Sequence, residues 1–97
     1  MIKLPTRVTL VEVGPRDGLQ NEKTPIATAI KVDLCKQLIE AGIQRLEAAA
    51  FVSPKWVPQM ADGTDVLAGL KAMPSLNSYK VSYSALVPNL KGMEAAI

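Results

Sequence analysis

The sequence contains no histidine and only one cysteine, Cys35, in 97 residues. A single cysteine excludes an internal disulfide framework and is typical of proteins from a reducing compartment. The sequence also shows no Cys/His metal motif. Cys35 falls within an apolar helical pattern, so we interpret it as a small core residue, with a reactive thiol as the alternative.

Long hydrophobic runs and an excess of one charge are also absent. No stretch approaches the roughly 18 apolar residues of a membrane span, and the first residues resemble neither a secretory signal nor a transit peptide. We therefore expect a cytoplasmic protein with no membrane partner. The formal net charge is +2, and lysines and arginines are scattered along the chain, so we expect no nucleic-acid partner.

The remaining composition, 48% hydrophobic and 21% charged, is ordinary for one small globular domain. Apolar segments rich in β-branched or small residues predict three strands, at Arg7–Val13, Ile43–Ala50 and Lys80–Val87. Helical patterns follow each strand, at about Ala29–Ala41, Asp65–Met73 and Leu90–Ile97. This alternation predicts an α/β fold with parallel strands. The spacing of about 35 to 40 residues per unit fits the first three βα units of a (β/α)8 TIM barrel, which needs about 250 residues.

Capping residues mark the expected helix ends. In the first helix we expect Thr28 as the N-cap and Gly42 as the C′ glycine. The same helix shows an apolar stripe built on Ile30, Leu34 and Leu38, with Cys35 and Ile39 one residue on. The second helix is expected to begin at a cap formed by Asp62 or Thr64, and the third at Asn89.

A dense polar cluster follows the first predicted strand. Gly14-Pro15 ends the apolar run and turns the chain, which places Arg16, Asp17, Gln20 and Asn21 at the carboxyl end of that strand. Ligands of parallel α/β proteins bind at this end. Arg16 offers a fork of donors for an anion, and Asp17 is a hard oxygen ligand for a divalent metal. The alternative is an Arg–Asp pair that braces a loop.

Two further residues could border the same site. Glu47 falls near the end of the second predicted strand, where it is either solvated or on the same edge of the sheet as Arg16 and Asp17. Trp56 lies in the proline-marked loop that follows, where it either shields a site or packs onto the domain.

Three blocks of the sequence resemble one known family. The stretch Val11–Glu22, which reads VEVGPRDGLQNE, is similar to the opening signature of the hydroxymethylglutaryl-CoA lyases. A wider superfamily of metal-dependent barrel lyases and synthases shares only the Arg-Asp-Gly-x-Gln core of it. The blocks Phe51–Met60 and Val87–Gly92 agree with the lyases in the same order along the chain.

The resemblance implies that residues 1–97 are the N-terminal part of a pyruvate-carboxyltransferase-like TIM-barrel domain, truncated in its third helix. It implies cleavage of 3-hydroxy-3-methylglutaryl-CoA, an acyl-CoA substrate, to acetyl-CoA and acetoacetate with a divalent metal, Mg²⁺ or Mn²⁺. By position in the motif, Asp17 matches a metal ligand, Arg16 a catalytic and substrate-binding residue, Glu47 a catalytic residue, and Gln20 a substrate-binding residue. Whether a full-length parent forms a homo-oligomer is left open.

The chain departs from the family pattern in several ways. The family's His-x-His metal pair, a later metal-binding asparagine and a catalytic loop cysteine have no counterpart here, and Cys35 does not match that cysteine. Ala48–Ala50 stand where relatives often carry Thr or Ser, so the substrate contacts of this strand are in doubt. Two alternatives follow, namely a non-catalytic α/β fragment and a related metal-dependent aldolase or acyl-CoA condensing enzyme.

Overall fold

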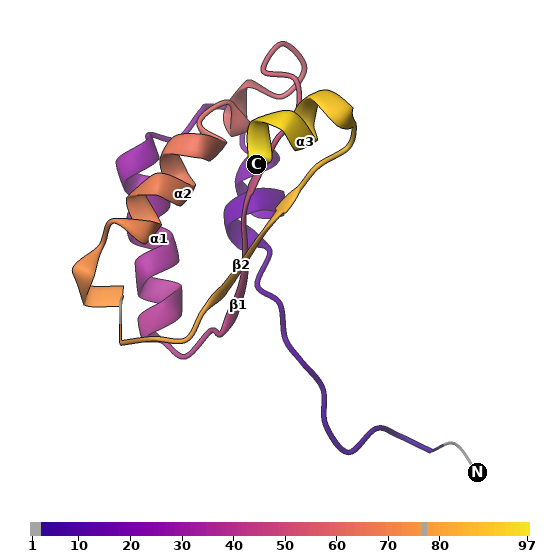
Figure 1. The fold of residues 1–97 in the computed structure, drawn as a ribbon, viewed down its shortest axis with the longest axis vertical. Helices are drawn as coiled ribbons and strands as arrows, with labels where there is room; N and C mark the ends of the chain where they lie inside the picture. The colour runs from indigo at the N-terminus through magenta and orange to yellow at the C-terminus, as the bar shows by residue number, and fades with distance from the viewer. Residues whose placement is uncertain (1–2, 77) are drawn as a thin grey trace.

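A parallel pair of strands packed against helices forms the body of the protein (Figure 1). The computed structural model describes residues 3–76 and 78–97. In chain order, its helices and strands are α1 (Thr28–Glu40), β1 (Arg45–Ala50), α2 (Gly63–Lys71), β2 (Ser82–Leu86) and α3 (Leu90–Ala96). β1 and β2 are hydrogen-bonded neighbours. The predicted α/β class and the parallel direction of these two strands are therefore confirmed.

The predicted first strand, Arg7–Val13, is wrong. Only Glu12 pairs with β1, through one parallel bridge in which its N–H donates to Arg45 O at 3.0 Å and its carbonyl accepts from Glu47 N at 2.9 Å. Val8 and Leu10 are 71% and 75% exposed. With a partner on one side only, these residues gain too little burial to hold an extended strand. The described residues thus form a two-stranded sheet rather than three βα units, and the chain before Val11 leads away from the body (Figure 1).

A π-helical turn, Gly14–Gly18, replaces the sharp turn expected after Val13. Pro15 lies in the first turn of this helix, where a backbone N–H has no partner within the helix, so the N–H that proline lacks is not needed. The N–H groups of Arg16 and Asp17 both donate to Val13 O, at 3.1 and 2.7 Å. Such turns concentrate at functional sites, and this one carries the polar cluster.

The C-terminal end of α1 is formed as the sequence predicts. Gly42 has φ +114°, a conformation that other residues rarely adopt. Its N–H donates to Ile39 O and that of Ile43 to Leu38 O, at 3.0 and 3.1 Å. These two bonds are those of a Schellman motif, so the C′ assignment is confirmed.

The buried face of α1 differs from the expected stripe. Ile30 is 61% exposed, whereas Lys31, Val32, Cys35 and Ile39 are buried. The face of α1 that is turned toward the core is therefore shifted by about one residue from the predicted apolar stripe. The reason is the packing of α2, since Val32 lies so close to Gly69 that a Cβ there would be 3.0 Å from its Cγ2.

Two of the expected N-caps do not form. Neither Thr28 nor Asp62 makes a side-chain capping bond to its own helix; the Thr28 hydroxyl instead donates to Asp62 Oδ2 at 2.5 Å. This tertiary bond takes the oxygens that a cap would use. Asn89 does cap α3, because its Oδ1 accepts from Gly92 N at 2.8 Å.

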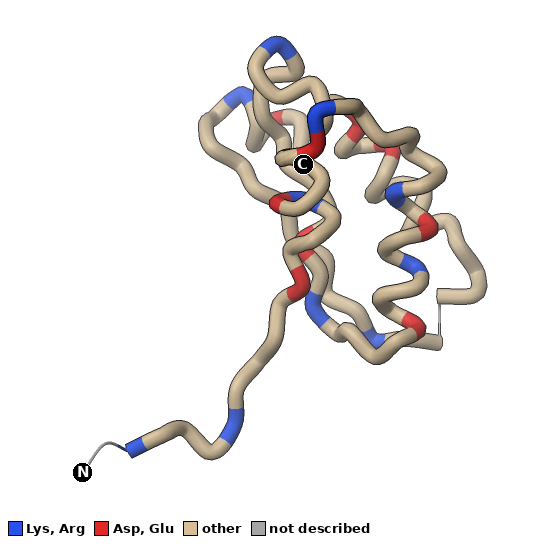
Figure 2. Tube along the Cα trace, turned by 180° about the vertical axis from the view of Figure 1, so that it is seen from behind, with Lys and Arg blue, Asp and Glu red and all other residues tan. Residues whose placement is uncertain are grey.

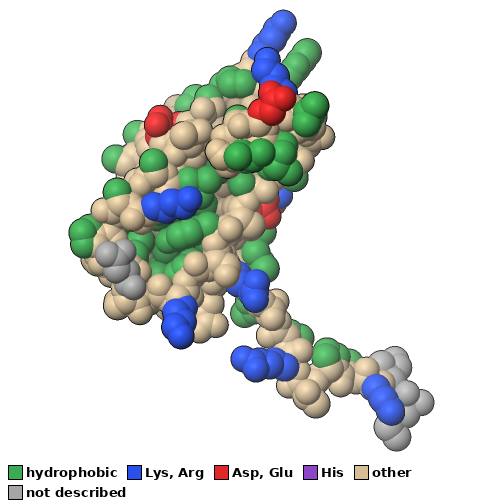
Figure 3. Space-filling view, in the orientation of Figure 1, with side chains coloured by type: hydrophobic (Ala, Val, Ile, Leu, Met, Phe, Trp, Pro, Cys, Tyr) green, Lys and Arg blue, Asp and Glu red, His purple; other side chains and the backbone are tan. Residues whose placement is uncertain are grey.

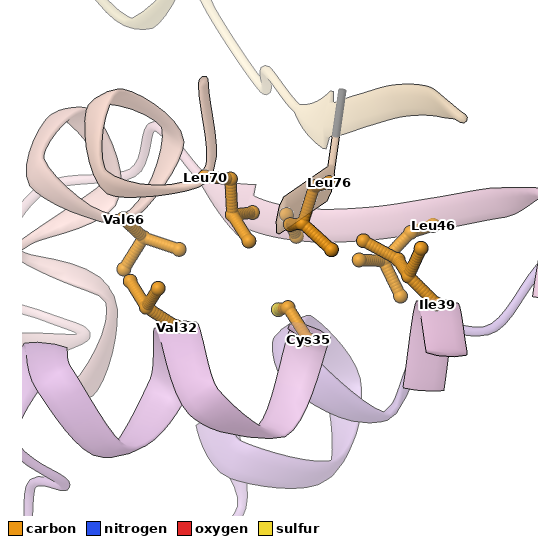
Figure 4. Close-up of a cluster of buried hydrophobic side chains, with 8 residues drawn as sticks. Val32, Cys35, Ile39, Leu46, Val66, Leu70 and Leu76 are labelled. Carbon is orange, nitrogen blue, oxygen red and sulfur yellow. The ribbon is translucent and has the colours of Figure 1, made fainter. Parts of the chain in front are cut away.

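The core lies between α1, α2 and the sheet. In Figure 4, Val32 of α1 points toward Val66 of α2, and Ile39 of α1 lies beside Leu46 of β1. The residues of this cluster are Val32, Cys35, Ile39, Leu46, Ala48, Val66, Leu70 and Leu76. Along β2 the burial alternates, with the odd-numbered positions from Val81 to Val87 half-buried. Of the helices that the structure describes, none combines the length and apolar character that a membrane crossing requires.

Candidate functional site

The guanidinium group of Arg16 is bound by Glu47. Its Nε donates to Glu47 Oε1 at 2.6 Å, and both side chains are 19% exposed. The Glu12 bridge to β1 places the π-turn beside Glu47, which lies in the middle of β1 rather than near its end. Of the two interpretations that the sequence left open for Glu47, the bond to Arg16 favours a position beside Arg16 and Asp17 over a solvated one.

Asp17 lies next to this pair but takes little part in it. Its carboxylate is 57% exposed, and its Oδ1 is 3.5 Å from the nearest guanidinium nitrogen of Arg16. Asn21 Nδ2 donates to the backbone oxygen of Asp17 at 2.9 Å and so holds the turn. Arg16 and Asp17 do form the ion pair of the alternative interpretation, at 3.5 Å, but Glu47 is the closer partner of Arg16, at 2.6 Å.

The donor set fits one ligand of a divalent metal. The Asp17 carboxylate is a hard oxygen ligand open to solvent. Across residues 3–76 and 78–97, no group of three or more Asp, Glu, Cys or His side chains could hold a metal ion. A metal bound at Asp17 would therefore take its other ligands from outside these residues.

Gln20 adds a polar group without a partner. Its side-chain oxygen is buried and accepts no hydrogen bond within the described part of the chain. A buried acceptor left unpaired costs about 1 to 3 kcal/mol. This cost favours a donor supplied by a ligand or by further protein.

The exposure of Trp56 agrees with neither of the two roles that the sequence suggested for it, shielding a site or packing onto the domain. The side chain is 79% exposed, so it neither packs onto the domain nor shields a site. The nearest cation is Lys55, whose Nζ is 5.9 Å from the ring centroid. The loop that carries both residues leaves β1 at its carboxyl end.

A cavity of about 230 Å³ opens beside this loop, between the start of α2 and the first turn of α3. Ala50 forms part of its wall, and Ala48–Ala50 are all buried. The polar residues around it are Ser53, Thr64, Asn89 and Lys91. Arg16, Asp17, Gln20 and Glu47 do not line it, so the cavity is separate from the polar cluster.

The sequence reasoning missed a buried cluster built on Lys31. The Lys31 ammonium group is 2.6 Å from Asp62 Oδ1 and also binds Gln59 O. Burial raises the pKa of Asp62, but the hydrogen bonds from Lys31 and Thr28 outweigh it, so that the pKa lies below its usual value. The sequence did contain one sign of this cluster: Lys31 lies on the same helical face as Cys35 and Ile39, so a helix that buries those two residues also buries the lysine.

The guanidinium group of Arg16, held by Glu47, and the exposed Asp17 carboxylate both lie beside parallel strands. This arrangement is typical of α/β proteins that bind ligands through the loops that follow their strands. The sequence comparisons identify the particular relatives. The chain is 55% identical over 94 residues to the human mitochondrial hydroxymethylglutaryl-CoA lyase, covering 97% of this chain and 27% of the relative. It is also 55% identical over 96 residues to a 3-hydroxy-3-isohexenylglutaryl-CoA/hydroxymethylglutaryl-CoA lyase of Pseudomonas aeruginosa, covering 99% and 30%.

Solved structures agree. A hydroxymethylglutaryl-CoA lyase from Pseudomonas aeruginosa superposes with a TM-score of 0.83 at 57% identity, covering 96% of this chain and 29% of that one. A lyase from Acinetobacter baumannii in complex with coenzyme A and 3-methylmalate gives 0.79 at 43% identity, covering 91% and 27%. No family model matches the chain. The resemblance to the hydroxymethylglutaryl-CoA lyases is thus confirmed over nearly the whole chain, which spans less than a third of the relatives.

Proposed function

We propose that this chain is part of a lyase that cleaves 3-hydroxy-3-methylglutaryl-CoA to acetyl-CoA and acetoacetate. The observation that carries the proposal is the Arg16–Glu47 ion pair beside the exposed Asp17, in a chain 55% identical to such lyases. In the proposed parent, residues 1–97 form the N-terminal part of a TIM-barrel domain, and the exposed edge formed by Glu12 and the preceding residues belongs to its first strand.

Arg16 stabilises the negative charge that develops during the reaction. Cleavage of the C–C bond, after the tertiary hydroxyl loses its proton, leaves a thioester enolate. The bond to Glu47 uses Nε of Arg16, and Nη1 lies 3.5 Å from Asp17 Oδ1, which leaves Nη2 for the enolate oxygen. Glu47 fixes the direction of the fork, and a fixed cation at this oxygen lowers the barrier most.

Asp17 would hold the divalent metal, Mg²⁺ or Mn²⁺. When bound, this metal supplies Lewis-acid chemistry, since it acidifies the substrate hydroxyl and orients it. The exposure of the Asp17 carboxylate supports this assignment. The buried Gln20 oxygen supports a role in substrate binding, because a donor on the substrate would satisfy it.

The proposed partner is an acyl-CoA. The relative from Acinetobacter baumannii was solved with coenzyme A, which supports the assignment. The cytoplasmic location is likewise proposed: the human relative is named as mitochondrial, whereas the name of the Pseudomonas aeruginosa relative states no location.

A second candidate is a non-catalytic α/β fragment. It is favoured by the donor set, because residues 3–76 and 78–97 contain no group of three or more Asp, Glu, Cys or His side chains that could hold a metal ion. The other alternative, a related aldolase or condensing enzyme, has no support in the comparisons reported above, whose relatives are lyases.

A hybrid enzyme tests the proposal. These 97 residues replace the matching segment of the Pseudomonas aeruginosa lyase, and acetoacetate release from hydroxymethylglutaryl-CoA is measured with Mg²⁺ or Mn²⁺. We expect activity, loss of activity in Asp17→Asn, and no loss in Asp33→Asn, an exposed matched control on α1. A folded hybrid without activity would favour the non-catalytic fragment.

A further inference from the structure

Lys31 lies near the start of α1 with its side chain only 4% exposed. Lysine is almost never buried to this extent unless its charge is paired. Here the ammonium group donates to the backbone oxygen of Gln59 and to Asp62 Oδ1. Both acceptors belong to the end of the segment Phe51–Asp62, which joins β1 to α2.

The Asp62 carboxylate is held from a second side by the same helix. Thr28 Oγ1 donates to Asp62 Oδ2 at 2.5 Å, while Lys31 binds the other oxygen at 2.6 Å. Both carboxylate oxygens are thus bound by the first turn of α1. Because Asp62 immediately precedes α2, these bonds attach the end of the β1–α2 loop to α1.

Gln59 extends the connection to the segment after the candidate site. Its Nε2 donates to the backbone oxygen of Glu22 at 2.8 Å. Glu22 follows the π-turn that carries Arg16, and the β1–α2 loop follows the strand that carries Glu47. The segment that follows the π-turn and the β1–α2 loop are therefore connected to each other through Gln59 and Lys31.

We propose that Lys31 is a positioning residue. Through Asp62 and Gln59, it locks the loop 51–62 against the segment 19–27, so that the two segments bordering the candidate site keep one arrangement. A purely structural contact between α1 and α2 would be served as well by apolar packing. The bond from Lys31 to the backbone oxygen of Gln59 and the bond from Gln59 to Glu22 instead connect the two loops to each other.

Limited trypsin digestion of the 97-residue chain tests the lock directly. Lys55 lies in the loop and reports its opening, whereas Arg45 precedes the fully buried Leu46 in β1 and reports unfolding of the sheet. We expect Lys31→Met to raise the rate of cleavage at Lys55 relative to Arg45 by about tenfold, the effect of losing one charged hydrogen bond. Lys31→Arg should restore part of the protection.

Two controls make the result specific. Lys36→Met removes a half-buried lysine of the same helix, which pairs with Glu40 at 3.7 Å, and should leave the ratio unchanged. Gln59→Ala removes the bond to Glu22 without leaving a buried charge, and should raise the ratio even if Lys31→Met unfolds the chain. An unchanged ratio in both Lys31→Met and Gln59→Ala would overturn the lock.

The consequence for catalysis rests on the proposed function and is measured in the hybrid enzyme. Lys31→Met should raise KM for the acyl-CoA severalfold with kcat nearly unchanged, since Glu47 still orients Arg16 while the loops that bind substrate are loosened. An inactive unsubstituted hybrid would count against the proposed function alone, because digestion judges the lock separately. An unchanged KM in an active hybrid would refute the role of Lys31 in substrate binding.

Discussion

Glu47 determines what Arg16 can do. The 2.6 Å bond to Nε orients a guanidinium group that is only 19% exposed, and a partly buried ion pair with a charge-assisted bond is held more firmly than a surface pair. Asp17, one residue further along, points largely into solvent. Of these two adjacent residues, Arg16 is therefore held closely by Glu47, whereas Asp17 has only a longer ion pair with Arg16 and keeps most of its carboxylate in solvent.

The first residue-scale prediction is that Arg16→Lys lowers kcat of the hybrid enzyme by about a hundredfold, the usual effect of losing an oxyanion donor. Lysine carries the charge but not the fork, so it cannot bind Glu47 and the substrate together. The concentration of metal needed for half-maximal activity should change little. Titration of Mg²⁺ at saturating substrate measures both quantities, and a wild-type kcat would remove Arg16 from the catalytic residues.

The second residue-scale prediction concerns Cys35. Burial raises the pKa of its thiol from 9.0 to about 11. Because folding disfavours the thiolate, the contribution of this thiol to stability is fully present below pH 9 and is lost as the pH rises toward 11. We expect iodoacetamide to modify Cys35 far more slowly at pH 8 in the native chain than in urea.

Urea denaturation at pH 8 and pH 10.5 measures the pH effect, with Cys35→Ala as the reference. The variant should be less stable at pH 8, because it leaves a small void, and should lose less stability than the unsubstituted chain on going to pH 10.5. Rapid alkylation of the native chain would show instead that Cys35 is a reactive thiol.

At the scale of elements, helix ends and helix faces have different determinants. The Schellman motif at Gly42 depends on residues adjacent in sequence. The buried face of α1 depends on α2, which packs Gly69 against Val32. Thr28 illustrates the same division, since its hydroxyl binds Asp62 rather than capping its own helix.

We predict that Gly42→Ala destabilises the chain by about 1 to 2 kcal/mol, since an L-residue resists the positive φ that this position requires. Gly18→Ala is the matched control, because its Cβ would meet no atom within 4 Å and no positive φ is found there. Urea denaturation measures both. Equal effects of the two substitutions would show that the C-terminal motif of α1 contributes nothing specific.

At the scale of the whole molecule, the main feature is apolar surface that remains exposed to solvent. The radius of gyration is 14.6 Å, above the roughly 13 Å of a compact domain of this size, because the segment before Val11 projects from the body. Figure 3 shows hydrophobic side chains gathered in the middle of one face. Figure 2 shows charges of both signs dispersed along the trace. Leu10, Leu90 and Ile97 are at least 75% exposed.

We expect the 97-residue chain by itself to show no lyase activity and to bind 1-anilinonaphthalene-8-sulfonate or aggregate. Asp17 as the one proposed metal ligand leaves most of a metal's coordination to water, and the exposed apolar residues favour association. Acetoacetate release from hydroxymethylglutaryl-CoA with Mg²⁺ or Mn²⁺ is measured against a control that contains only metal. Turnover above that control would show that the missing histidines are not required.

The sequence by itself determined the features that depend on near neighbours. The C-terminal end of α1, the start of α3, the two paired strands and the position of the turn at Gly14-Pro15 follow from glycine, proline, capping residues and apolar spacing within a few residues. The motif around Arg16 was sufficient to identify the relatives, because it is a contiguous block. Both kinds of signal are local, so they can be read without a structure.

Only the tertiary structure decided the remaining features. The bond between Arg16 and Glu47 spans 31 positions, and so does the bond between Lys31 and Asp62. Residues 7–13 have strand propensity, but the part of the chain that the structure describes offers them β1 as a neighbour and no second strand, and within it their pairing is limited to the Glu12 bridge. Contacts between distant segments depend on which elements are present to pack, and local sequence patterns do not contain that information.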